Sequence, residues 1–131
     1  MEAQYNNAYV PIVGEPTEKI TLHLSCRNLA DLDTFSVSDP VCHLFVNDGE
    51  DPNKWLLFGE TEQIENNLNP DFVTHFAMDY YFEREQRLKV KVYDVDITEL
   101  EHIGDVEWTL GEIMGSQNTT LVKDLYLPNK K

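Results

Sequence analysis

Acidic side chains gather in two short stretches of this sequence, and their type and spacing suit them to bind a cation. The first stretch contains Asp33 and Asp39, and the second begins with Asp94 and Asp96. Calcium is a hard cation that takes about six to eight oxygen ligands, which carboxylates from two loops at one end of a fold can supply. The pattern therefore indicates a calcium site shared between two loops.

The Asp94-Val95-Asp96 step gives a geometric reason for this interpretation. Residues two apart in an extended chain point to the same side, so both carboxylates are expected to line one cavity. Without a cation, neighbouring carboxylates repel one another, and this repulsion destabilises the fold. The simpler alternative is that both loops are only solvated, because acidic residues are frequent throughout the chain.

An EF-hand loop does not explain the second stretch. Counted from Asp94, the position that requires glycine holds Glu99, and the closing position holds Asp105 rather than glutamate. The residues before Asp94 also alternate as a strand does, whereas an EF-hand loop follows a helix. The acidic loops therefore need a different scaffold.

Composition excludes several classes of function. The 131 residues include 24 acidic and 10 basic ones, which gives a formal net charge of -14. A chain this acidic is not expected to bind nucleic acid, nor to adhere to an anionic membrane until its charge is neutralised locally. No apolar run approaches the roughly 18 residues of a membrane span, and Met1–Ala8 lacks the features of a signal peptide. The sequence therefore predicts a cytoplasmic chain.

No motif indicates catalysis. The sequence lacks a G-x-S-x-G motif, a Cys/His metal spacing and a glycine-rich phosphate loop. Its four histidines have no catalytic partner nearby in the sequence. We therefore predict that the domain is not an enzyme.

The two cysteines fall within strand-like runs. Alternation places Cys26 and Cys42 on the sides expected to face inward. Because free cysteine is among the most buried residue types, we interpret both as buried, reduced thiols. Neighbouring strands can in principle bring the two together.

Alternating apolar and polar residues predict the elements that must position the acidic loops. A domain of this size has one core, and its period-2 segments predict seven strands. These are residues Ile20–Cys26, Cys42–Val46, Trp55–Thr61, Phe72–Tyr80, Leu88–Tyr93, Val106–Leu110 and Leu121–Leu127. Turn residues separate the segments and no amphipathic helix lies between them, which favours an antiparallel β-sandwich. Residues 1–18 are polar and form an N-terminal arm.

Several motifs together resemble a known family. They are Asn28–Asp33 with Ser38-Asp39-Pro40, Asn67–Pro70, Val92–Asp96 and Ile103-Gly104, which resemble the successive signatures of a C2 domain. Residues 79–83, 88–94 and 109–113 are similar to the first C2 domain of copines in particular. The resemblance spans about residues 19 to 114. It implies an all-β, antiparallel Greek-key β-sandwich of the C2 type with type II topology and seven to eight strands, occupying residues 19–131.

The resemblance also implies a set of calcium ligands. Its acidic members are Asp33 and Asp39 in the first binding loop and Asp94, Asp96 and Glu101 in the third. Further oxygens are expected from Thr98 and from the backbone carbonyls of Leu32 and Val95. The family usually has aspartate at the last acidic position, so Glu101 is a departure, in a loop one residue shorter than usual. The five carboxylates carry about -5, which two calcium ions nearly cancel.

The function implied is calcium-dependent binding to anionic phospholipids of the phosphatidylserine type. A cytoplasmic chain is then recruited peripherally to membranes, with the plasma membrane favoured, when calcium rises. The apolar loop residues Phe35, Ile97 and Leu100 are expected to insert, each contributing about 1.5 to 3 kcal/mol if fully buried. Phe35 packed inward is the alternative for that residue. The alternative function is a calcium-independent protein–protein interaction module.

Basic residues predict no further lipid site. Many C2 domains carry a lysine-rich strand that binds phosphoinositides, whereas the matching region here, Asn47–Gln63, has Lys54 as its only basic residue. Four basic residues do lie within Arg84–Lys91, where a solvated outer face is expected.

The last strand of the family fold has no counterpart in the sequence. Copine-like topology expects an eighth strand after Leu127, but the sequence ends at Lys131. We expect a fragment of a longer copine-like protein that lacks this strand. The alternatives are that Tyr9–Val13 fills the vacant edge or that the edge is open to a partner chain.

Overall fold

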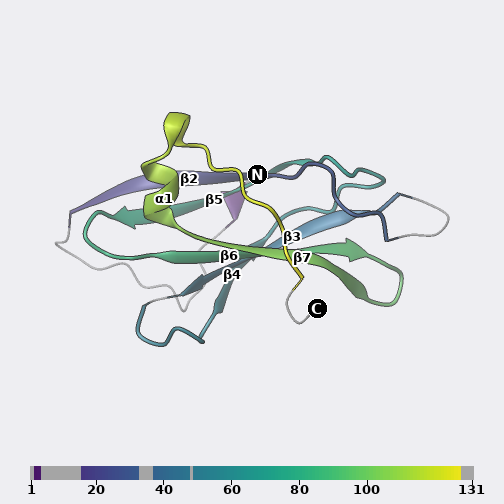
Figure 1. Ribbon diagram of the computed structural model, residues 1–131, viewed down its shortest axis with the longest axis horizontal. Helices are drawn as coiled ribbons and strands as arrows, with labels where there is room; N and C mark the ends of the chain where they lie inside the picture. Colours follow the sequence, from purple (N-terminus) through teal and green to yellow (C-terminus); the bar gives the residue numbers. More distant parts are fainter. Residues whose placement is uncertain (1, 4–15, 33–36, 48, 128–131) are drawn as a thin grey trace.

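The computed structural model describes residues 16–32, 37–47 and 49–127, and the backbone of residues 2–3. Strands are its main elements (Figure 1). In chain order the elements are β1 (Glu2–Ala3), β2 (Thr17–Ser25), β3 (Pro40–Asn47), β4 (Leu56–Glu60), β5 (Asp71–Tyr81), β6 (Arg87–Val95), β7 (Leu100–Thr109), α1 (Leu110–Met114) and a short 3-10 turn (Gln117–Thr119). Among these described residues, no helix has the length and apolarity that crossing a membrane requires.

The strands form two sheets. One has four strands in the order β4-β3-β6-β7, and the other has three in the order β1-β5-β2. Each pair is antiparallel except β1, whose two residues pair in parallel with β5. The two sheets pack face to face, so the predicted antiparallel β-sandwich is confirmed.

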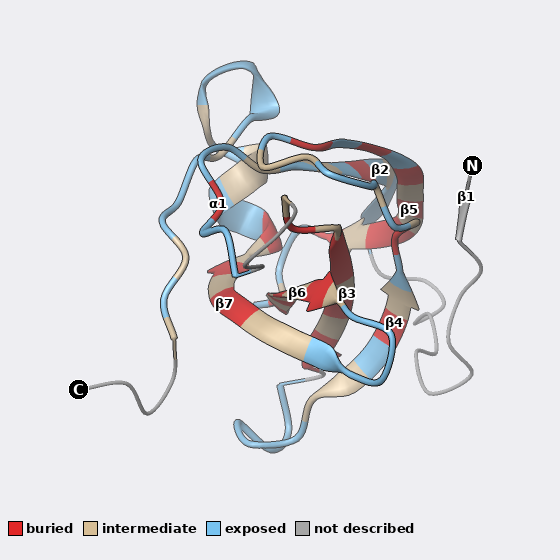
Figure 2. Cartoon of the chain, turned by 90° about the vertical axis from the view of Figure 1, so that its right-hand side faces the viewer, coloured by how far each residue is buried: buried red, intermediate tan, exposed pale blue. Residues whose placement is uncertain are grey.

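Alternation explains why these residues form strands with one buried face. In β6, Leu88, Val90 and Val92 are buried, whereas Lys89 and Lys91 between them are partly exposed. Figure 2 shows the same alternation of buried and more exposed residues along β5 and β6, whereas most of β3 is buried. A period of two residues in both sheets places all apolar faces between the sheets.

Aromatic rings join the two sheets inside the core. Phe58 of β4 and Phe76 of β5 lie 6.2 Å apart between ring centroids in an edge-to-face arrangement. Both are buried, together with Leu44 of β3 and Met78 of β5. This packing fixes the relative position of the sheets, and therefore of the loops at their ends.

The predicted strand Val106–Leu110 is wrong at both ends. β7 begins at Leu100, because Leu100 pairs with Val95 and continues the β6–β7 hairpin through a stretch with several polar residues. Leu110 starts α1 instead of ending the strand. Thr109 caps that helix, since its side chain accepts a hydrogen bond from the Glu112 N–H and the Glu112 carboxylate accepts one from the Thr109 N–H.

The predicted strand Leu121–Leu127 is also wrong. Only Tyr126 makes a β-bridge, with Asp105, through backbone hydrogen bonds of 2.6 and 2.9 Å. In Figure 1 this yellow segment passes across β7. The described residues therefore contain six strands longer than two residues plus the two-residue β1, whereas seven to eight strands were expected.

A glycine allows this segment to approach the sheet. A Cβ atom on Gly104 of β7 would lie 3.0 Å from Leu125 Cβ and 3.1 Å from the Tyr126 carbonyl oxygen. Both distances are shorter than ordinary van der Waals contact, so a larger residue at this position would displace the segment.

The edge next to β2 has no strand beside it in the described part of the chain. β2 is the last strand of the order β1-β5-β2. Tyr9–Val13, the segment considered for this edge, lies outside the described residues.

Candidate metal site

The start of β3 and the end of β6 lie side by side at one end of the sandwich, which we call the loop end. Pro40, the first residue of β3, pairs with Asp94. Just beyond, the Val95 N–H donates to the Asp39 carbonyl oxygen, 3.0 Å away. Strand pairing therefore places the two acidic loops next to each other.

Asp94 carries a buried carboxylate that the described protein satisfies only in part. The residue has 0% of its surface exposed. Its Oδ1 accepts a hydrogen bond of 2.8 Å from the Asp39 N–H. Its Oδ2 is buried and has no hydrogen-bond partner among the described residues. Because a buried carboxylate oxygen without a partner is unfavourable, this atom fits a site for a hard cation.

Asp39 is held in place by a segment that follows β4. Its Oδ1 accepts a hydrogen bond of 2.7 Å from the Asn66 N–H. Asn66 adopts a positive φ of 51°, which asparagine tolerates better than most residues. The neighbouring Asn67 N–H donates to the Ser38 carbonyl oxygen, 3.1 Å away. A third loop thus closes over the same end and orients the Asp39 carboxylate.

Asp96 and Glu101 belong to the β6–β7 hairpin. The Asp96 N–H donates to the Glu99 carbonyl oxygen at 2.9 Å, and Asp96 Oδ1 accepts from the Ile97 N–H at 2.7 Å. Glu101 is the cross-strand partner of Asp94. Thr98 is exposed in the turn between the strands. Asp96 therefore uses one carboxylate oxygen within its own turn.

The described ligand candidates do not converge into one group. No set of three or more histidine, cysteine, aspartate or glutamate side chains is positioned to hold a metal within residues 16–32, 37–47 and 49–127. Asp33, a predicted ligand of the first loop, lies outside these residues, as does Phe35. The structure thus brings Asp39 and Asp94 together, and the full ligand set stays a prediction.

Ser38 supports the first loop in a way that sequence analysis missed. It is completely buried, and its Oγ accepts a hydrogen bond of 3.0 Å from the Leu32 N–H. The hydroxyl also lies 3.4 Å from the Ala30 carbonyl oxygen, to which it donates. The resemblance included Ser38 in its first motif, but no signal identified the Leu32 N–H, six residues earlier, as the partner of the Ser38 hydroxyl.

Glu62 is a further carboxylate at the loop end, and it accepts backbone hydrogen bonds with both of its oxygens. Its Oε2 accepts from the Val73 N–H at 2.6 Å, and its Oε1 accepts from the Thr74 N–H at 3.1 Å. Burial acts to raise the pKa of this carboxyl, but the hydrogen bonds to Val73 and Thr74 outweigh it and lower the pKa to about 2. Glu62 is therefore anchored as an anion at the start of β5.

Apolar side chains project from the loop end. Ile97 is 99% exposed at the tip of the hairpin, and Leu100 is 43% exposed beside it. Leu32, in the first loop, is 39% exposed. Exposed apolar residues that gather around a candidate site are typical of an interaction surface.

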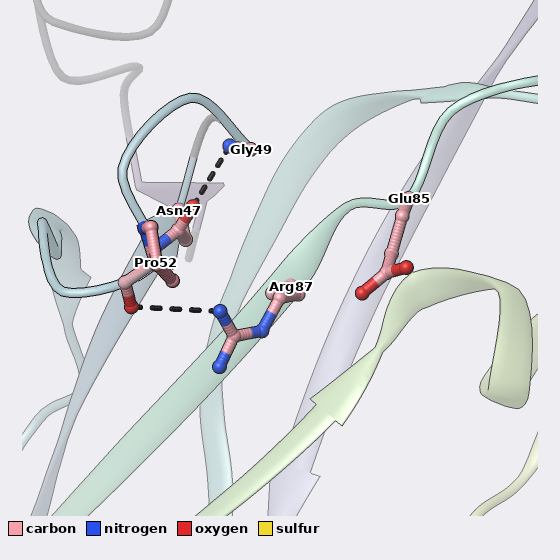
Figure 3. Close-up of a pocket in the computed structure, with 5 residues that line it drawn as sticks. All are labelled: Asn47, Gly49, Pro52, Glu85 and Arg87. Carbon is pink, nitrogen blue, oxygen red and sulfur yellow. Dashed lines mark hydrogen bonds between the residues drawn. The ribbon is translucent and has the colours of Figure 1, made fainter.

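A cavity lined by described residues lies at the opposite end, which we call the far end. It has a volume of about 320 Å³ and is lined by Asn47, Gly49, Pro52, Glu85 and Arg87. Figure 3 shows that its polar groups bond to one another, since Gly49 N–H donates to Asn47 and Arg87 donates to the Pro52 carbonyl oxygen. The lining carries one acidic side chain, Glu85, and one basic side chain, Arg87, so its charge favours no particular ligand.

Comparisons with known proteins identify relatives along most of the chain. The C2 domain family matches residues 19–125. Copine-A of Dictyostelium discoideum is 37% identical over 116 residues, which cover 88% of this chain and 19% of that protein. Copine-E of the same organism is 39% identical over 118 residues, which cover 86% of this chain and 20% of that protein. The chain thus spans about a fifth of the length of these relatives. Copine-like C2 relatives suggest a non-catalytic module.

Solved structures share the fold at low sequence identity. A calcium-bound pair of C2 domains from Extended-Synaptotagmin 2 matches with a TM-score of 0.57 and 19% identity, covering 78% of this chain and 37% of that one. A C2 domain of plant Extended Synaptotagmin 1 matches with a TM-score of 0.56 and 22% identity, and the match covers 70% of this chain and 67% of that one. C2 domains commonly bind calcium, anionic phospholipids or proteins. The family match and the sandwich together show that this chain belongs to the C2 domain family and carries a C2 domain of the copine type.

Proposed function

We propose that this domain binds calcium at the loop end and, in that state, docks on membranes that contain anionic phospholipids. The observation that supports the proposal is Asp94 Oδ2, a buried carboxylate oxygen with no partner in the described part of the chain. It lies in a residue whose other oxygen is bonded to the backbone of Asp39. A protein that leaves such an atom unsatisfied loses stability, unless the atom serves a ligand.

Asp39 and Asp94 form the preorganised part of the proposed site. Asp94 is fixed by strand pairing in β6, and the Asp39 carboxylate is oriented by the Asn66 N–H. The remaining proposed ligands come from the two loops and are Asp33, Asp96, Glu101, Thr98 and the carbonyl oxygens of Leu32 and Val95. Two calcium ions, when bound, would supply about +4 of charge and coordination positions that a lipid headgroup oxygen can complete.

The charge of the chain explains why docking would depend on calcium. The net charge of -14 repels an anionic leaflet, and the acids at the loop end face the lipid first in the proposed orientation. Once those acids are neutralised, the exposed side chains of Ile97 and Leu100 can enter the interface. Phe35 is proposed to insert with them. A cytoplasmic protein would thus be recruited to membranes, including the plasma membrane, when calcium rises.

Vesicle co-sedimentation tests the proposal. Vesicles with phosphatidylserine and vesicles of phosphatidylcholine alone are compared across a calcium titration with a chelator control. We expect binding only when both calcium and phosphatidylserine are present. Asp94→Asn should weaken this binding at least tenfold. Asp124→Asn removes the same charge from an exposed acid outside the loop end, so it should bind like the parent chain.

A calcium-independent protein-interaction module is the second candidate. It is favoured by the bonds that Asp39 Oδ1 and Asp96 Oδ1 already make within the protein, which leave fewer free ligand atoms. Absence of vesicle binding at millimolar calcium, with circular dichroism showing folded protein, would support this second function and reject the first.

A further inference from the structure

The two cysteines lie against each other, although they belong to different sheets. Cys26 directly follows β2 of the three-stranded sheet, and Cys42 lies in β3 of the four-stranded sheet. Both are free thiols and they share a side-chain hydrogen bond. Cys42 belongs to the buried core cluster, and Cys26 packs against that cluster. Sheet packing, rather than pairing of neighbouring strands, thus brings the sulfur atoms together.

The backbones on both sides of this pair are anchored. The Cys26 N–H donates to the Pro70 carbonyl oxygen at 2.9 Å. The Cys42 N–H donates to Thr61 Oγ1 at 2.8 Å, and its carbonyl oxygen accepts from the Thr61 N–H at 2.8 Å. Cys42 is also paired with Val92 in β6. These bonds keep the two thiols close without any ligand at the loop end.

The two thiols differ in exposure and in proton affinity. Cys42 is 1% exposed, and its pKa is raised by the hydrogen bond to Cys26 and by burial. Cys26 is partly exposed, and its pKa is lowered by the hydrogen bond from Cys42, against the effect of burial and with help from the Arg27 charge. The Cys42 S–H therefore donates to the Cys26 sulfur. This asymmetry is typical of a dithiol in which one sulfur attacks and the other resolves.

Arg27 is held where it can support a Cys26 thiolate. Its guanidinium donates to the Cys26 carbonyl oxygen at 2.6 Å and to Asp71 Oδ1 at 2.8 Å. A positive charge anchored beside a thiol favours its anionic form, which is the nucleophile in thiol chemistry.

We propose that Cys26 and Cys42 form an oxidation site that closes to an intramolecular disulfide when the domain meets a peroxide. The Cys26 thiolate attacks one peroxide oxygen, so that an S–O bond forms, the O–O bond breaks and the leaving hydroxide takes a proton to become water. The Cys42 sulfur then attacks the Cys26 sulfenic acid, an S–S bond forms, and the S–O bond breaks with release of a second water. The two thiols lose two electrons, and one peroxide gains them.

This disulfide would constrain the first acidic loop. The bond would close a covalent ring around residues 27–41, which contain Asp39 and the predicted ligand Asp33. Cross-linking reduces the conformations open to such a loop in the unfolded chain. In a reducing compartment, disulfides of this kind are usually transient and respond to oxidants. The site would therefore link oxidation to the stability of the loop end, and it stands whether or not calcium binds there.

Peroxide titration of the purified chain tests the proposal. After brief treatment with hydrogen peroxide, free thiols are counted and the intact mass is measured without reductant. We expect the monomer to lose both free thiols and the mass of two hydrogens, and dithiothreitol to restore both. The oxidised chain should unfold about 10 °C above the reduced chain, and dithiothreitol should reverse this shift.

Two variants separate the roles of the sulfurs. Cys42→Ala removes the resolving thiol, so its Cys26 should accumulate a sulfenic acid that dimedone traps. Cys26→Ser removes the attacking thiol, so its buried Cys42 should stay unmodified over the same time. Circular dichroism of both variants checks that they are folded.

Three results would overturn the proposal. They are two free thiols persisting in the folded parent chain, disulfides found only between molecules, and Cys26→Ser consuming peroxide as fast as the parent.

Discussion

The two ends of β6 each bury a polar side chain, and the protein satisfies these side chains very differently. At the far end, the Gln86 amide donates to the Asp79 carbonyl oxygen and accepts from the Tyr81 N–H, both at 2.8 Å. At the loop end, Asp94 Oδ2 has no partner among the described residues. Gln86 thus joins β5 to β6 and contributes to stability, whereas Asp94 detracts from it. The difference contrasts a buried amide that the protein satisfies with a buried carboxylate at the end where we propose a ligand site.

Gln86→Ala should have the largest effect on stability. The substitution leaves the Tyr81 N–H and the Asp79 carbonyl oxygen buried without their partner, and it also creates a cavity. We expect the free energy of unfolding to fall by about 3 kcal/mol. Urea unfolding measures this change, with Gln63→Ala as an exposed control. A loss below about 1 kcal/mol would remove the contrast between the two ends.

Ser38→Ala should have the next largest effect. Its buried hydroxyl accepts from the Leu32 N–H, which would lose this partner. We expect a loss of about 1 to 2 kcal/mol in the free energy of unfolding, and lower calcium affinity if the first loop contributes ligands. Ser25→Ala, at an exposed position of β2, is the control for urea unfolding. Equal stability of the two variants would show that Ser38 does not support the loop.

Ile97→Ala tests whether the hairpin tip enters the membrane. Removing most of an inserted apolar side chain should weaken calcium-dependent vesicle binding about tenfold, with no change in the calcium requirement. Val122→Ala shortens another exposed side chain, 89% exposed and outside the loop end, and should leave vesicle binding unchanged. Equal vesicle affinities for the two variants would place the membrane contact elsewhere.

Asp94→Asn sharpens the comparison between buried acids. Asparagine keeps an oxygen for the Asp39 N–H and removes a buried charge, so stability in chelator should be unchanged or higher by about 1 kcal/mol. Asp105 is the matched control because it is also buried, but its Oδ1 is bonded to His102. Asp105→Asn should lower the free energy of unfolding, as measured by urea denaturation. If Asp94→Asn destabilises as much as Asp105→Asn, the Asp94 carboxylate has a structural role.

Glu62→Gln should produce the smallest change, a loss of stability that is present at neutral pH and disappears in acid. The pKa of Glu62 is lowered to about 2 in the folded domain, so the unfolded chain binds more protons between about pH 4.5 and 2. The contribution of Glu62 to stability is therefore complete above this window and is lost as pH falls through it. Urea unfolding at pH 3 and pH 7 should show a smaller difference for Glu62→Gln than for the parent or for Glu65→Gln. An unchanged difference would contradict this role.

Strict alternation made the central strands predictable, and its absence caused the errors. Cys42, Leu44 and Val46 of β3 and Leu88, Val90 and Val92 of β6 recur at every second position, and both strands lie within about two residues of their predicted bounds. The first half of β7 was missed because its pairing depends on the Val95–Leu100 hairpin, not on its own pattern. Leu121–Leu127 does alternate, but Val122 is 89% exposed and the segment gains only one bridge. Sequence period alone does not reveal whether a partner strand is available.

The candidate site was predictable at the level of its loops but not of its bonds. Adjacency of Asp39 and Asp94 follows from placing both acidic loops at one end of a sandwich. The partners that hold these residues come from distant positions, such as Asn66, which is 27 residues from Asp39. The roles of Ser38 and Gln86 were likewise invisible, because a buried polar side chain shows its function only through the atoms it meets.

The segment that covers β7 has a consequence for behaviour in concentrated solution. β7 is an edge strand, and exposed edges can recruit strands from other molecules into extended sheets. Tyr126 occupies both backbone groups of Asp105, and the Lys123 ammonium donates to the Glu107 carbonyl oxygen. These contacts take up hydrogen-bonding groups of β7 that an incoming strand would need. The charge of Lys123 at this edge also opposes pairing with a strand of another molecule. Residues 121–127 thereby protect this edge of the domain against aggregation.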